Sequence, residues 1–389
     1  MLTGLATDPT RLQPLMPERN GMNAPLTSGS ATFRFDPSAT PVDANERAAR
    51  LVDPGFGRVF TDHMAVVRYS EGKGWHDAAI TARAPVTVDP STAVLHYAQE
   101  IFEGLKAYRL DDGGMALFRP QANARRFNNS ARRLAMPELP EDLFLESCRQ
   151  LVRTERDWFP AVDGGALYLR PFMFASEAFL GVKPSAEYLY MVIASSVGAY
   201  WKGGARAVSI WVSQNYTRAA PGGTGEAKCG GNYAASLAAQ SEAIAQGCDQ
   251  VVFLDAVERR WVEELGGMNV FFVFDDGSMV TPPLTGTILP GITRDSIIRI
   301  ARDRGIVVRE EPYGIDQWRA DAASGRLTEA FACGTAAVVT PIGEVVGVDG
   351  RFTIGGGGTG QLTKAMLDAL SAIQRGRAPD THGWLERLG

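Results

Sequence analysis

Residues 214–233 read QNYTRAAPGGTGEAKCGGNY, a stretch that places one lysine, Lys228, between two glycine-rich segments. Arg218 lies ten residues before this lysine and Tyr233 five residues after it. Glycine adopts backbone conformations with positive φ and lets a backbone approach a ligand closely. A lysine in such a loop is poorly placed to be only a solubilising charge. We therefore interpret Lys228 as a nucleophilic amine that forms a Schiff base with a carbonyl group.

Two glycine motifs suggest other sites, and neither fits. A phosphate-binding P-loop follows the pattern GxxxxGK[ST], whereas Ala227 precedes Lys228 and Cys229 follows it. Residues 355–360 read GGGGTG and satisfy GxGxxG, but too few residues follow them for a βαβ unit. The local residues alone also allow a surface loop with an incidental lysine, so the rest of the chain must decide.

Size and composition restrict the class of protein. A chain of 389 residues exceeds what one hydrophobic core usually spans, which predicts two domains. The net charge of −5 gives no reason to expect a nucleic-acid partner. The four cysteines and four histidines lack the spacing of a disulfide framework or a zinc site, so we expect no metal. No signal sequence and no apolar run long enough for a membrane span is visible, which predicts a cytoplasmic enzyme.

The apolar pattern predicts two α+β domains. Residues 1–45 are rich in Pro, Ser, Thr, Ala and Gly and predict a partly irregular extension, with order beginning near Gly55. A small domain is expected over 46–197, a linker over 198–207 and a large domain over 208–389. Strands and helices do not alternate strictly, which argues against a doubly wound parallel sheet. Strands are expected at 64–67, 93–95, 105–108, 115–118, 166–169, 189–193, 208–212, 251–254 and 270–274, and helices after Pro120 and over 141–158, 232–246, 291–304 and 361–373.

Three further features are candidates for a site around the lysine. Residues 289–296, LPGITRDS, resemble a helix start, where backbone N–H groups and the helix dipole attract an anion. The pair Glu263-Glu264 lies in a mainly apolar segment, where one carboxylate could meet a protonated ring nitrogen, although a helix or turn surface explains it equally well. A cluster of arginines on one predicted helix could supply a basic partner for the anion, although these arginines could equally form a solvent-exposed helix face. Its members are Arg119, Arg125, Arg126, Arg132 and Arg133.

Several motifs, in order along the chain, resemble those of the branched-chain amino acid aminotransferases, which are pyridoxal-phosphate enzymes of fold type IV. The resemblance implies a two-domain α+β fold similar to that of D-amino-acid aminotransferase. It also implies a transaminase that moves the amino group of L-leucine, L-isoleucine or L-valine to 2-oxoglutarate through a pyridoxal-phosphate Schiff base on Lys228. The motifs are GFGRVFTDHM at 55–64, FEGLKAY at 102–108, FRP at 118–120, LYLRP at 167–171, GGNY at 230–233, LTGTILPG at 284–291 and GWL at 383–385.

The resemblance implies roles in cofactor binding. Lys228 matches the lysine that holds pyridoxal phosphate and moves the proton at the substrate Cα. Tyr233 matches the tyrosine that bonds the O3′ atom of the cofactor. Glu264 matches the acid that keeps the pyridine nitrogen protonated, so that the ring accepts electrons. Arg126, the N–H groups of Ile292 and Thr293, and Thr335 match the groups that bind the phosphate. The remaining cofactor-binding residues are Arg218, Leu289 and Gly291.

The resemblance also implies a substrate pocket. Aromatic side chains would bury the aliphatic group, which is worth roughly 1.5–3 kcal/mol, although without the family context each of them would be read as core. Arg170 is our candidate partner for the γ-carboxylate of glutamate, because a buried unpaired carboxylate is costly. Two residues would reach the site from a second subunit and make a homodimer necessary. In order, the substrate-binding residues are Phe56, Tyr97 and Val182 (both from the other subunit), Phe102, Tyr168, Arg170, Tyr200, Gly267, Met268, Thr335 and Ala336.

Two rival functions follow from the same residues. A D-amino-acid aminotransferase or an aminodeoxychorismate-lyase-like enzyme would share the lysine and the phosphate site. The aromatic pocket and the choice between L- and D-substrates would distinguish these enzymes from a branched-chain aminotransferase. A protein that merely binds the cofactor would need neither Lys228 nor Glu264. The expected partners are small-molecule substrates and a second copy of the chain, without nucleic acid or membrane.

Overall fold

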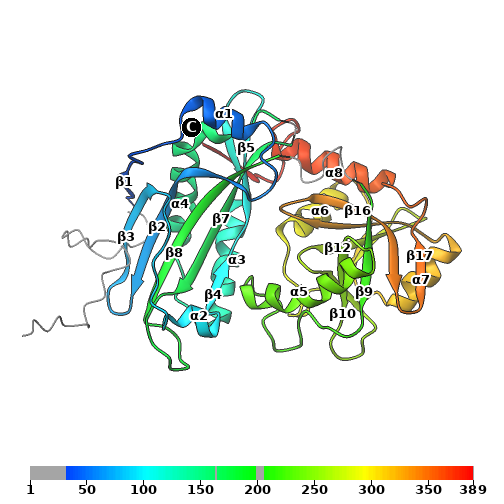
Figure 1. Cartoon of the computed structure of the whole chain (residues 1–389). Helices are drawn as coiled ribbons and strands as arrows, with labels where there is room; N and C mark the ends of the chain where they lie inside the picture. The colour runs from blue at the N-terminus through cyan, green and yellow to red at the C-terminus, as the bar shows by residue number, and fades with distance from the viewer. Residues whose placement is uncertain (1–31, 163, 199–205, 389) are drawn as a thin grey trace, which may run out of the picture.

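The chain forms two lobes, each built on a sheet. The computed structural model describes residues 32–162, 164–198 and 206–388, and within these ranges each sheet has nine strands. Figure 1 shows the two lobes side by side, the first in blue to green and the second in green to red. Strands and helices are mixed without strict alternation, which confirms the predicted α+β class. In these ranges no helix has the length and apolar character needed to cross a membrane.

The sheet of the first lobe is mostly antiparallel, and only β1 runs parallel to its neighbour β3. Its final strand, β18, comes from the C-terminus of the chain and pairs with β6. The strand order is β1 (Arg34–Asp36), β3 (Gly74–Ala82), β2 (Val59–Ser70), β8 (Glu187–Val197), β7 (Ala166–Ala175), β5 (Leu105–Arg109), β6 (Met115–Phe118) and β18 (Leu385–Leu388), and β4 (Glu100–Phe102) also pairs with β7.

Two amphipathic helices cover this sheet. Helix α3 (Pro120–Arg133) has proline at its first position, where the missing N–H costs nothing, and α4 (Glu141–Thr154) begins with two acidic residues that suit the helix dipole. Phe127 of α3 and Phe144 of α4 meet Tyr190 of β8, with ring centroids 5.6 and 6.2 Å from the tyrosine ring. The shorter helices of this lobe are α1 (Ala44–Leu51), α2 (Ala93–Tyr97) and a 3-10 turn (Arg156–Trp158).

The second lobe has a mixed sheet with helices on it. Helix α5 (Gly230–Ala245) packs on β9 and β10, and α6 (Ile292–Asp303), α7 (Ile315–Ser324) and α8 (Gln361–Gln374) pack on β15. The strand order is β11 (Val262–Leu265), β10 (Gln250–Leu254), β9 (Val208–Ser213), β16 (Val338–Gly347), β15 (Leu327–Gly334), β12 (Asn269–Phe274), β13 (Met279–Thr281) and β14 (Val308–Glu310), and β17 (Gly350–Thr353) pairs with β16.

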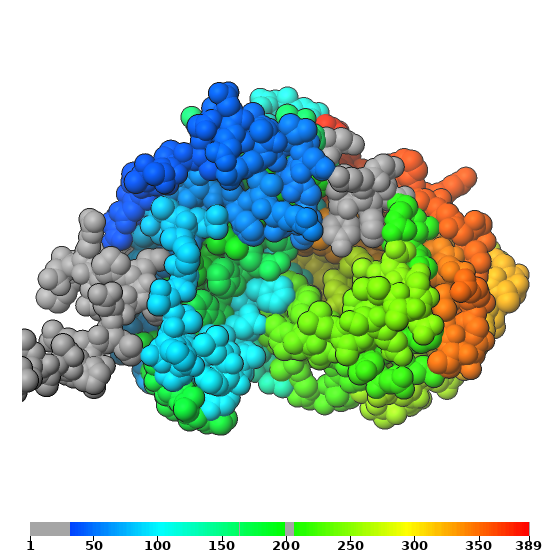
Figure 2. All heavy atoms as spheres, in the orientation of Figure 1, coloured from blue at the N-terminus to red at the C-terminus, as the bar shows by residue number. Residues whose placement is uncertain are grey.

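The lobes share a hydrophobic core. Phe118 and Tyr168 of the first sheet belong to the same buried cluster as Ile297 of α6, Phe331 of β15 and Met366 of α8. The lobes meet along a seam on the face drawn in Figure 2. Segments from both lobes therefore hold the groups that lie between them.

Three sequence expectations about the elements were wrong. Order begins before Gly55, because β1 and α1 form regular structure and β1 joins the first sheet. Residues 93–95 begin helix α2 rather than a strand, and this helix buries Ala93 but leaves Leu95 exposed. Three apolar residues are too few to show a period, so the sequence could not distinguish the two. Residues 315–324 form a helix, α7, that was not expected at all.

The division into a small domain up to residue 197 and a large domain from residue 208 remains a proposal. Most of the linker expected between them lies outside the described residues. Strand β18 belongs to the first sheet, so the last residues of the chain lie in the first lobe.

Candidate active site

Lys228 is fixed by backbone contacts with the first lobe. Its N–H donates to the hydroxyl of Ser130 in α3 at 2.9 Å, and its carbonyl accepts from the N–H of Phe102 in β4 at 2.9 Å. The flanking residues Ala227 and Cys229 are buried in the core of the first lobe. The glycine-rich loop, which precedes α5 of the second lobe, is thus held against the first lobe at the lysine.

The amine of Lys228 faces two aromatic rings. Its Nζ atom donates to the hydroxyl of Tyr233 at 2.7 Å and lies 5.1 Å from the centre of that ring. The ring of Phe102 is 4.8 Å from the same Nζ atom and 4.9 Å from the ring of Tyr233. Tyr233 lies in the first turn of α5, so the start of this helix positions the hydroxyl beside the amine.

Glu264 forms a buried ion pair with Arg218. One of its oxygens lies 2.8 Å from NH1 of Arg218 and accepts from the N–H of Leu289 at 2.8 Å, and both charged side chains are about 2% exposed. Burial raises the pKa of Glu264 to about 7, against the opposing effects of Arg218 and the Leu289 N–H. Near neutral pH this carboxyl group can therefore either hold or release a proton.

The neighbouring carboxylate has a different environment. Glu263 accepts a hydrogen bond from the hydroxyl of Thr287, and its other oxygen is buried without a hydrogen-bond partner among the described residues. Burial raises the pKa of this carboxyl group as well. Both glutamates lie in strand β11, so the alternative of a helix or turn surface does not apply.

The start of α6 and Arg126 lie together. Helix α6 follows Gly291, and no side chain caps its first turn, so backbone N–H groups of Ile292 and Thr293 remain available to an anion. NH1 of Arg126, in α3, donates to the carbonyl of Pro290 at 3.1 Å. An added Cβ atom at Gly291 would collide with the side chain of Asn269, so only glycine fits at this helix start.

A buried glutamate holds Arg126 in place. The Nε and NH2 atoms of Arg126 donate to the two oxygens of Glu103 at 2.7 and 2.8 Å, and Asn123 donates to the same carboxylate at 2.7 Å. Burial opposes the ionisation of Glu103, but the contact with Arg126 holds its pKa below the usual value. The bidentate contact leaves NH1 directed toward the helix start.

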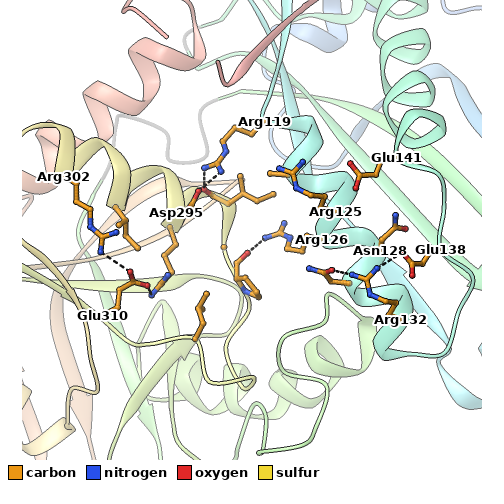
Figure 3. A pocket seen from close by; sticks show the side chains of 18 residues that line it. Arg119, Arg125, Arg126, Asn128, Arg132, Glu138, Glu141, Asp295, Arg302 and Glu310 are labelled. Atoms are coloured by element: carbon orange, nitrogen blue, oxygen red, sulfur yellow. Dashed lines mark hydrogen bonds and ion pairs between the residues drawn. The ribbon is translucent and has the colours of Figure 1, made fainter. Parts of the chain in front are cut away.

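A cavity of about 550 Å³ lies between α3 and α6, beside this helix start (Figure 3). Arg119 crosses it from the first lobe, where its guanidinium contacts Asp295 at 2.5 Å and donates to the hydroxyl of Ser296 at 2.8 Å. Arginine side chains outnumber carboxylates in its wall, which favours anions. The charged lining residues are Arg119, Arg125, Arg126, Arg132, Arg294, Arg302, Glu138, Glu141, Asp295 and Glu310.

A tight turn between β15 and β16 carries Thr335 and Ala336. The Nζ atom of Lys106, in β5, donates to the carbonyl of Ala336 at 2.8 Å and links this turn to the first lobe. Burial lowers the pKa of Lys106 to about 8. Val338 follows the turn with φ of 61°, a conformation that is strained for a β-branched side chain.

Gly267 and Met268 lie next to the same turn. The position that a Cβ atom would occupy at Gly267 is 3.6 Å from the ring of Tyr233. The corresponding position at Gly334 is 3.4 Å from the side chain of Met268. The loop between β11 and β12 therefore lies between Tyr233 and the turn at Thr335.

Aromatic side chains gather near Arg170. The ring of Tyr168 is 5.0 Å from the ring of Phe56, and its hydroxyl accepts from NH2 of Arg170 at 3.3 Å. The guanidinium carbon of Arg170 lies 4.9 Å from the centre of the Phe102 ring. An added Cβ atom at Gly104 would collide with the hydroxyl of Tyr168, so the glycine allows this ring to approach β5.

Two predicted substrate residues, Tyr97 and Val182, are not joined to this group. Tyr97 donates to the carbonyl of Leu180, and Tyr97 and Val182 are 39% and 88% exposed at the surface. No contact within the described residues connects either of them to Phe102 or Arg170. Tyr200 lies outside the described residues.

Sequence reasoning missed four residues that position the site, namely Glu103, Lys106, Ser130 and Asn269. Each acts on another group through a side-chain contact between distant segments, which local sequence does not reveal. Glu103 and Lys106 lie within the quoted FEGLKAY motif, and a charged residue in an otherwise apolar strand was the available signal.

Comparison with known proteins identifies the family. Residues 100–345 match the family described as amino-transferase class IV. The chain is 57% identical over 358 residues to the probable branched-chain-amino-acid aminotransferase of Streptomyces coelicolor, covering 92% of this chain and 99% of that protein. It is 55% identical over 368 residues to the branched-chain-amino-acid aminotransferase of Mycobacterium tuberculosis, covering 94% of this chain and all of that protein.

Solved structures agree in fold. The branched-chain amino acid aminotransferase from Escherichia coli has a TM-score of 0.67 at 31% identity, over 84% of this chain and 99% of that chain. The branched-chain amino acid aminotransferase from Thermobaculum terrenum, in its PLP form, has a TM-score of 0.68 at 27% identity, over 84% of this chain and 98% of that chain. The chain therefore belongs to the class IV aminotransferases and, within them, to the branched-chain-amino-acid aminotransferases.

Proposed function

We propose that this chain is a pyridoxal-phosphate-dependent transaminase that moves the amino group of L-leucine, L-isoleucine or L-valine to 2-oxoglutarate. The observation that carries the proposal is the position of the Lys228 amine, 2.7 Å from the hydroxyl of Tyr233 in a glycine-rich loop held against the first lobe. Neighbouring segments supply a helix start with an arginine and a buried carboxylate. An amine, an anion site and an acid are the three groups that this chemistry requires.

The residues present fit the cofactor. The uncapped first turn of α6 and the NH1 atom of Arg126 offer hydrogen-bond donors for a phosphate, and Thr335 would add a hydroxyl. The Nε atom of Arg218 is buried without a partner among the described residues, so this guanidinium retains a free donor. When bound, pyridoxal phosphate would supply an aldehyde that accepts the amino group and a ring that accepts electrons.

Lys228 is the proposed catalytic residue. Its amine would bind the aldehyde carbon and, once displaced by the substrate, would move the proton at the substrate Cα. The hydroxyl of Tyr233 orients this amine. General acid–base catalysis by a positioned group typically contributes about 10²–10⁴-fold to the rate, so the position of one nitrogen atom accounts for much of the activity.

Glu264 would hold a proton opposite the ring nitrogen. With a pKa near 7, its carboxyl group can share a proton with a pyridine nitrogen at neutral pH. Arg218 and the N–H of Leu289 keep the carboxylate in one orientation. In our proposal Arg218 and Leu289 therefore contribute by orienting the carboxyl group of Glu264.

The substrate would lie between the Thr335 turn and the aromatic group. The backbone of Thr335 and Ala336 would receive the α-carboxylate, and the rings of Phe56, Phe102 and Tyr168 would contact the aliphatic side chain. Arg170 would receive the γ-carboxylate of glutamate, because it retains a buried Nε atom without a partner among the described residues.

A second copy of the chain would complete the site. Helix α5 has one charged residue, Glu242, and its exposed face is apolar, with Leu237 and Ile244 each 64% exposed. A face of this kind is unusual for a helix in contact with water. We propose that it packs on the partner in a homodimer, which would also bring Tyr97 and Val182 of one subunit to the site of the other.

One spectroscopic experiment tests the proposed function. Purified protein loaded with pyridoxal phosphate should absorb visible light, lose that absorbance on addition of L-leucine, and regain it with 2-oxoglutarate. D-leucine serves as the control and should leave the absorbance unchanged. A response to D-leucine but not to L-leucine would instead favour a D-amino-acid aminotransferase.

A further inference from the structure

Arg170 carries a charge without a contacting carboxylate among the described residues. Its guanidinium carbon lies 4.9 Å from the centre of the Phe102 ring and 5.5 Å from that of the Tyr168 ring. Its one hydrogen bond within the described residues goes to the hydroxyl of Tyr168, and its buried Nε atom has no partner there. The aromatic rings therefore hold this arginine in place while most of its five donors remain available.

A carboxylate lies on the same face of the sheet. Strand β4 pairs with β7 so that Phe102 is opposite Phe172 and Glu100 is opposite Phe174. Because side chains alternate along a strand, Glu100 and Phe102 share this face with Arg170, which is two residues from Phe172. The guanidinium of Arg170 lies beside the Phe102 ring, which is two residues from Glu100 along β4.

The carboxylate of Glu100 is anchored. It accepts a hydrogen bond from the N–H of Gly230, the first residue of α5, two residues after Lys228. An added Cβ atom at Gly230 would collide with this carboxylate, so the glycine permits the contact. Burial raises the pKa of Glu100, while the Gly230 N–H and the attraction of Arg170 oppose that effect. Arg170 thus acts on Glu100 electrostatically without touching it.

Phe102 lies beside two basic side chains. The Nζ atom of Lys228 is 4.8 Å from its ring centre and the guanidinium carbon of Arg170 is 4.9 Å from it. A substrate with its Cα near Lys228 would place the end of its side chain toward Arg170. The same position must then accept an aliphatic group in one half of the reaction and a carboxylate in the other.

We propose that Glu100 sets the balance between apolar and acidic substrates by partly neutralising Arg170, an inference that rests on the proposed function. When an aliphatic side chain occupies the pocket, Arg170 has no anionic ligand, and Glu100 compensates its charge. When a γ-carboxylate binds, it competes with Glu100 for the same arginine. Glu100 therefore favours leucine and weakens the binding of glutamate. It is a positioning residue, because it acts through Arg170.

The test is the binding of two unreactive acids to the holoenzyme by calorimetry. Glutarate represents the acidic substrate and 4-methylvalerate the apolar one. The variant Glu100→Gln removes the charge and keeps an oxygen that can accept from the Gly230 N–H. Glutarate should bind about 5- to 10-fold more tightly to this variant and 4-methylvalerate about twofold more weakly. The KM for glutamate should fall accordingly, while kcat for each substrate stays within about twofold.

Further variants test whether any loss of a carboxylate has this effect and whether the effect depends on Arg170. Glu187→Gln removes an exposed carboxylate from the edge of β8 in the same lobe, and it should leave the ratio of the two affinities unchanged. In an Arg170→Leu background, Glu100→Gln should no longer alter that ratio, because the charge on which it acts is gone. Glu100→Asp keeps the charge, so its ratio of the two affinities should resemble that of the wild-type protein. If Glu100→Gln does not fold, Glu100→Asp is tested in its place, and an unchanged ratio is then the expected result.

The outcomes separate this inference from the proposed function. Equal changes for glutarate and 4-methylvalerate, or weaker binding of glutarate, would overturn the role of Glu100. An Asp variant with a strongly altered ratio would also overturn it. Absence of amino transfer in the wild-type protein would refute the proposed function instead, whatever the binding ratio.

Discussion

At the scale of single residues, the Lys228 amine has one hydrogen-bond partner among the described residues, the hydroxyl of Tyr233. Its charge is therefore compensated by aromatic rings and a phenol rather than by a contacting carboxylate. The amine is therefore held by this hydrogen bond and by contacts with two aromatic rings.

Replacement of this lysine should abolish amino transfer without unfolding the protein. Lys228→Ala should lower kcat by at least about 10³-fold, because in our proposal this amine moves the proton at the substrate Cα. Initial rates with L-leucine and 2-oxoglutarate measure the effect, and circular dichroism checks the fold. Lys364→Ala, at an exposed lysine of α8, is the control and should retain full activity. Undiminished transfer by Lys228→Ala would contradict the proposed mechanism.

Glu264 should make the stability of the cofactor-free protein depend on pH. Its pKa is raised in the folded state to about 7 from an ordinary value of 4.5, so folding favours its protonated form. The resulting stabilisation is present in full below pH 4.5 and is lost as the pH rises toward 7. Between pH 5 and pH 8, the unfolding free energy of the wild-type protein should fall by about 2 kcal/mol because of this group. Glu264→Gln should not show that decrease.

Urea denaturation at the two pH values measures this difference. Glu258→Gln, at an exposed position before β11, is the control and should change with pH as the wild-type protein does. Identical pH dependence in Glu264→Gln and the wild-type protein would show that the carboxyl group is already ionised at pH 5.

Much of the site could be predicted at this scale, because glycine-flanked Lys228 and the helix start at Gly291 carry local signals. The supporting residues could not. Glu103 is chemically meaningful because it meets Arg126 in space, and nothing in the intervening sequence indicates that pairing. Lys106 is similar, since its partner is the carbonyl of Ala336 in the other lobe.

At the scale of elements, the contact between β4 and α3 supports the anion site. Glu103 follows β4, and its carboxylate holds Arg126 of α3 with two hydrogen bonds while Asn123 of α3 completes the contact. This arrangement fixes the face of α3 toward α6. The geometry of the proposed phosphate site thus depends on one buried ion pair.

Removal of that pair should weaken both the fold and cofactor binding. Glu103→Gln leaves the Arg126 charge buried and uncompensated, which should cost about 3 kcal/mol of unfolding free energy. The dissociation constant of pyridoxal phosphate, measured by fluorescence titration, should rise about tenfold because Arg126 is no longer held in orientation.

The matched control for this change is Glu138→Gln. Glu138 follows α3 and forms an ion pair with Arg132, which lies in the same helix as Arg126, but both side chains of this pair are about half exposed. Its loss should cost less than about 1 kcal/mol and leave the dissociation constant unchanged. Equal effects of the two variants would refute the specific role of Glu103.

Element boundaries followed from the sequence wherever a segment was long and periodic. Helices α3, α5, α6 and α8 were predicted to within a few residues, because each is long and because an apolar face repeats over several turns in α3, α6 and α8. The short helix α2 was predicted as a strand, since three apolar residues fit either period. Strand β11 escaped prediction because its two central residues are glutamates, whose burial depends on Arg218 and Thr287 in other segments.

At the scale of the whole molecule, the apolar face of α5 is the feature that supports the proposed homodimer. Leu237 and Ile244 lie seven residues apart on one side of this helix and are both largely exposed in the single chain. Figure 1 places α5 on the side of the second lobe that faces the first. A subunit packed on this face would lie close to the Lys228 loop, which immediately precedes the helix.

A charge on this face should dissociate the proposed dimer. Leu237→Glu would bury a carboxylate at the interface, so light scattering after size exclusion should show a monomer at micromolar concentration. Activity should fall in parallel, because residues from the second subunit no longer reach the site. Val348→Glu, at a position of nearly equal exposure in the turn between β16 and β17, is the control and should remain a dimer. A dimeric, fully active Leu237→Glu variant would place the interface elsewhere.

The arrangement of the lobes was less predictable than their elements. Two α+β units followed from length and from the mixture of periods, but strand pairing between distant segments did not. The pairing of β18 with β6 joins residues from distant parts of the chain, and neither strand carries a sequence signal that names the other. The shared core between the lobes was unpredictable for the same reason, because nothing in the sequence around Phe118 or Phe331 indicates that the two residues belong to one cluster.

The position of β18 has a consequence for synthesis. While the chain emerges from the ribosome, β6 must wait as an unpaired edge until the final residues have been translated. The nascent first lobe is therefore exposed to aggregation while the second lobe is synthesised, and β18 then covers the β6 edge. A tag fused after this strand, or a deletion of a few terminal residues, acts on the N-terminal half of the protein rather than on the half to which it is attached.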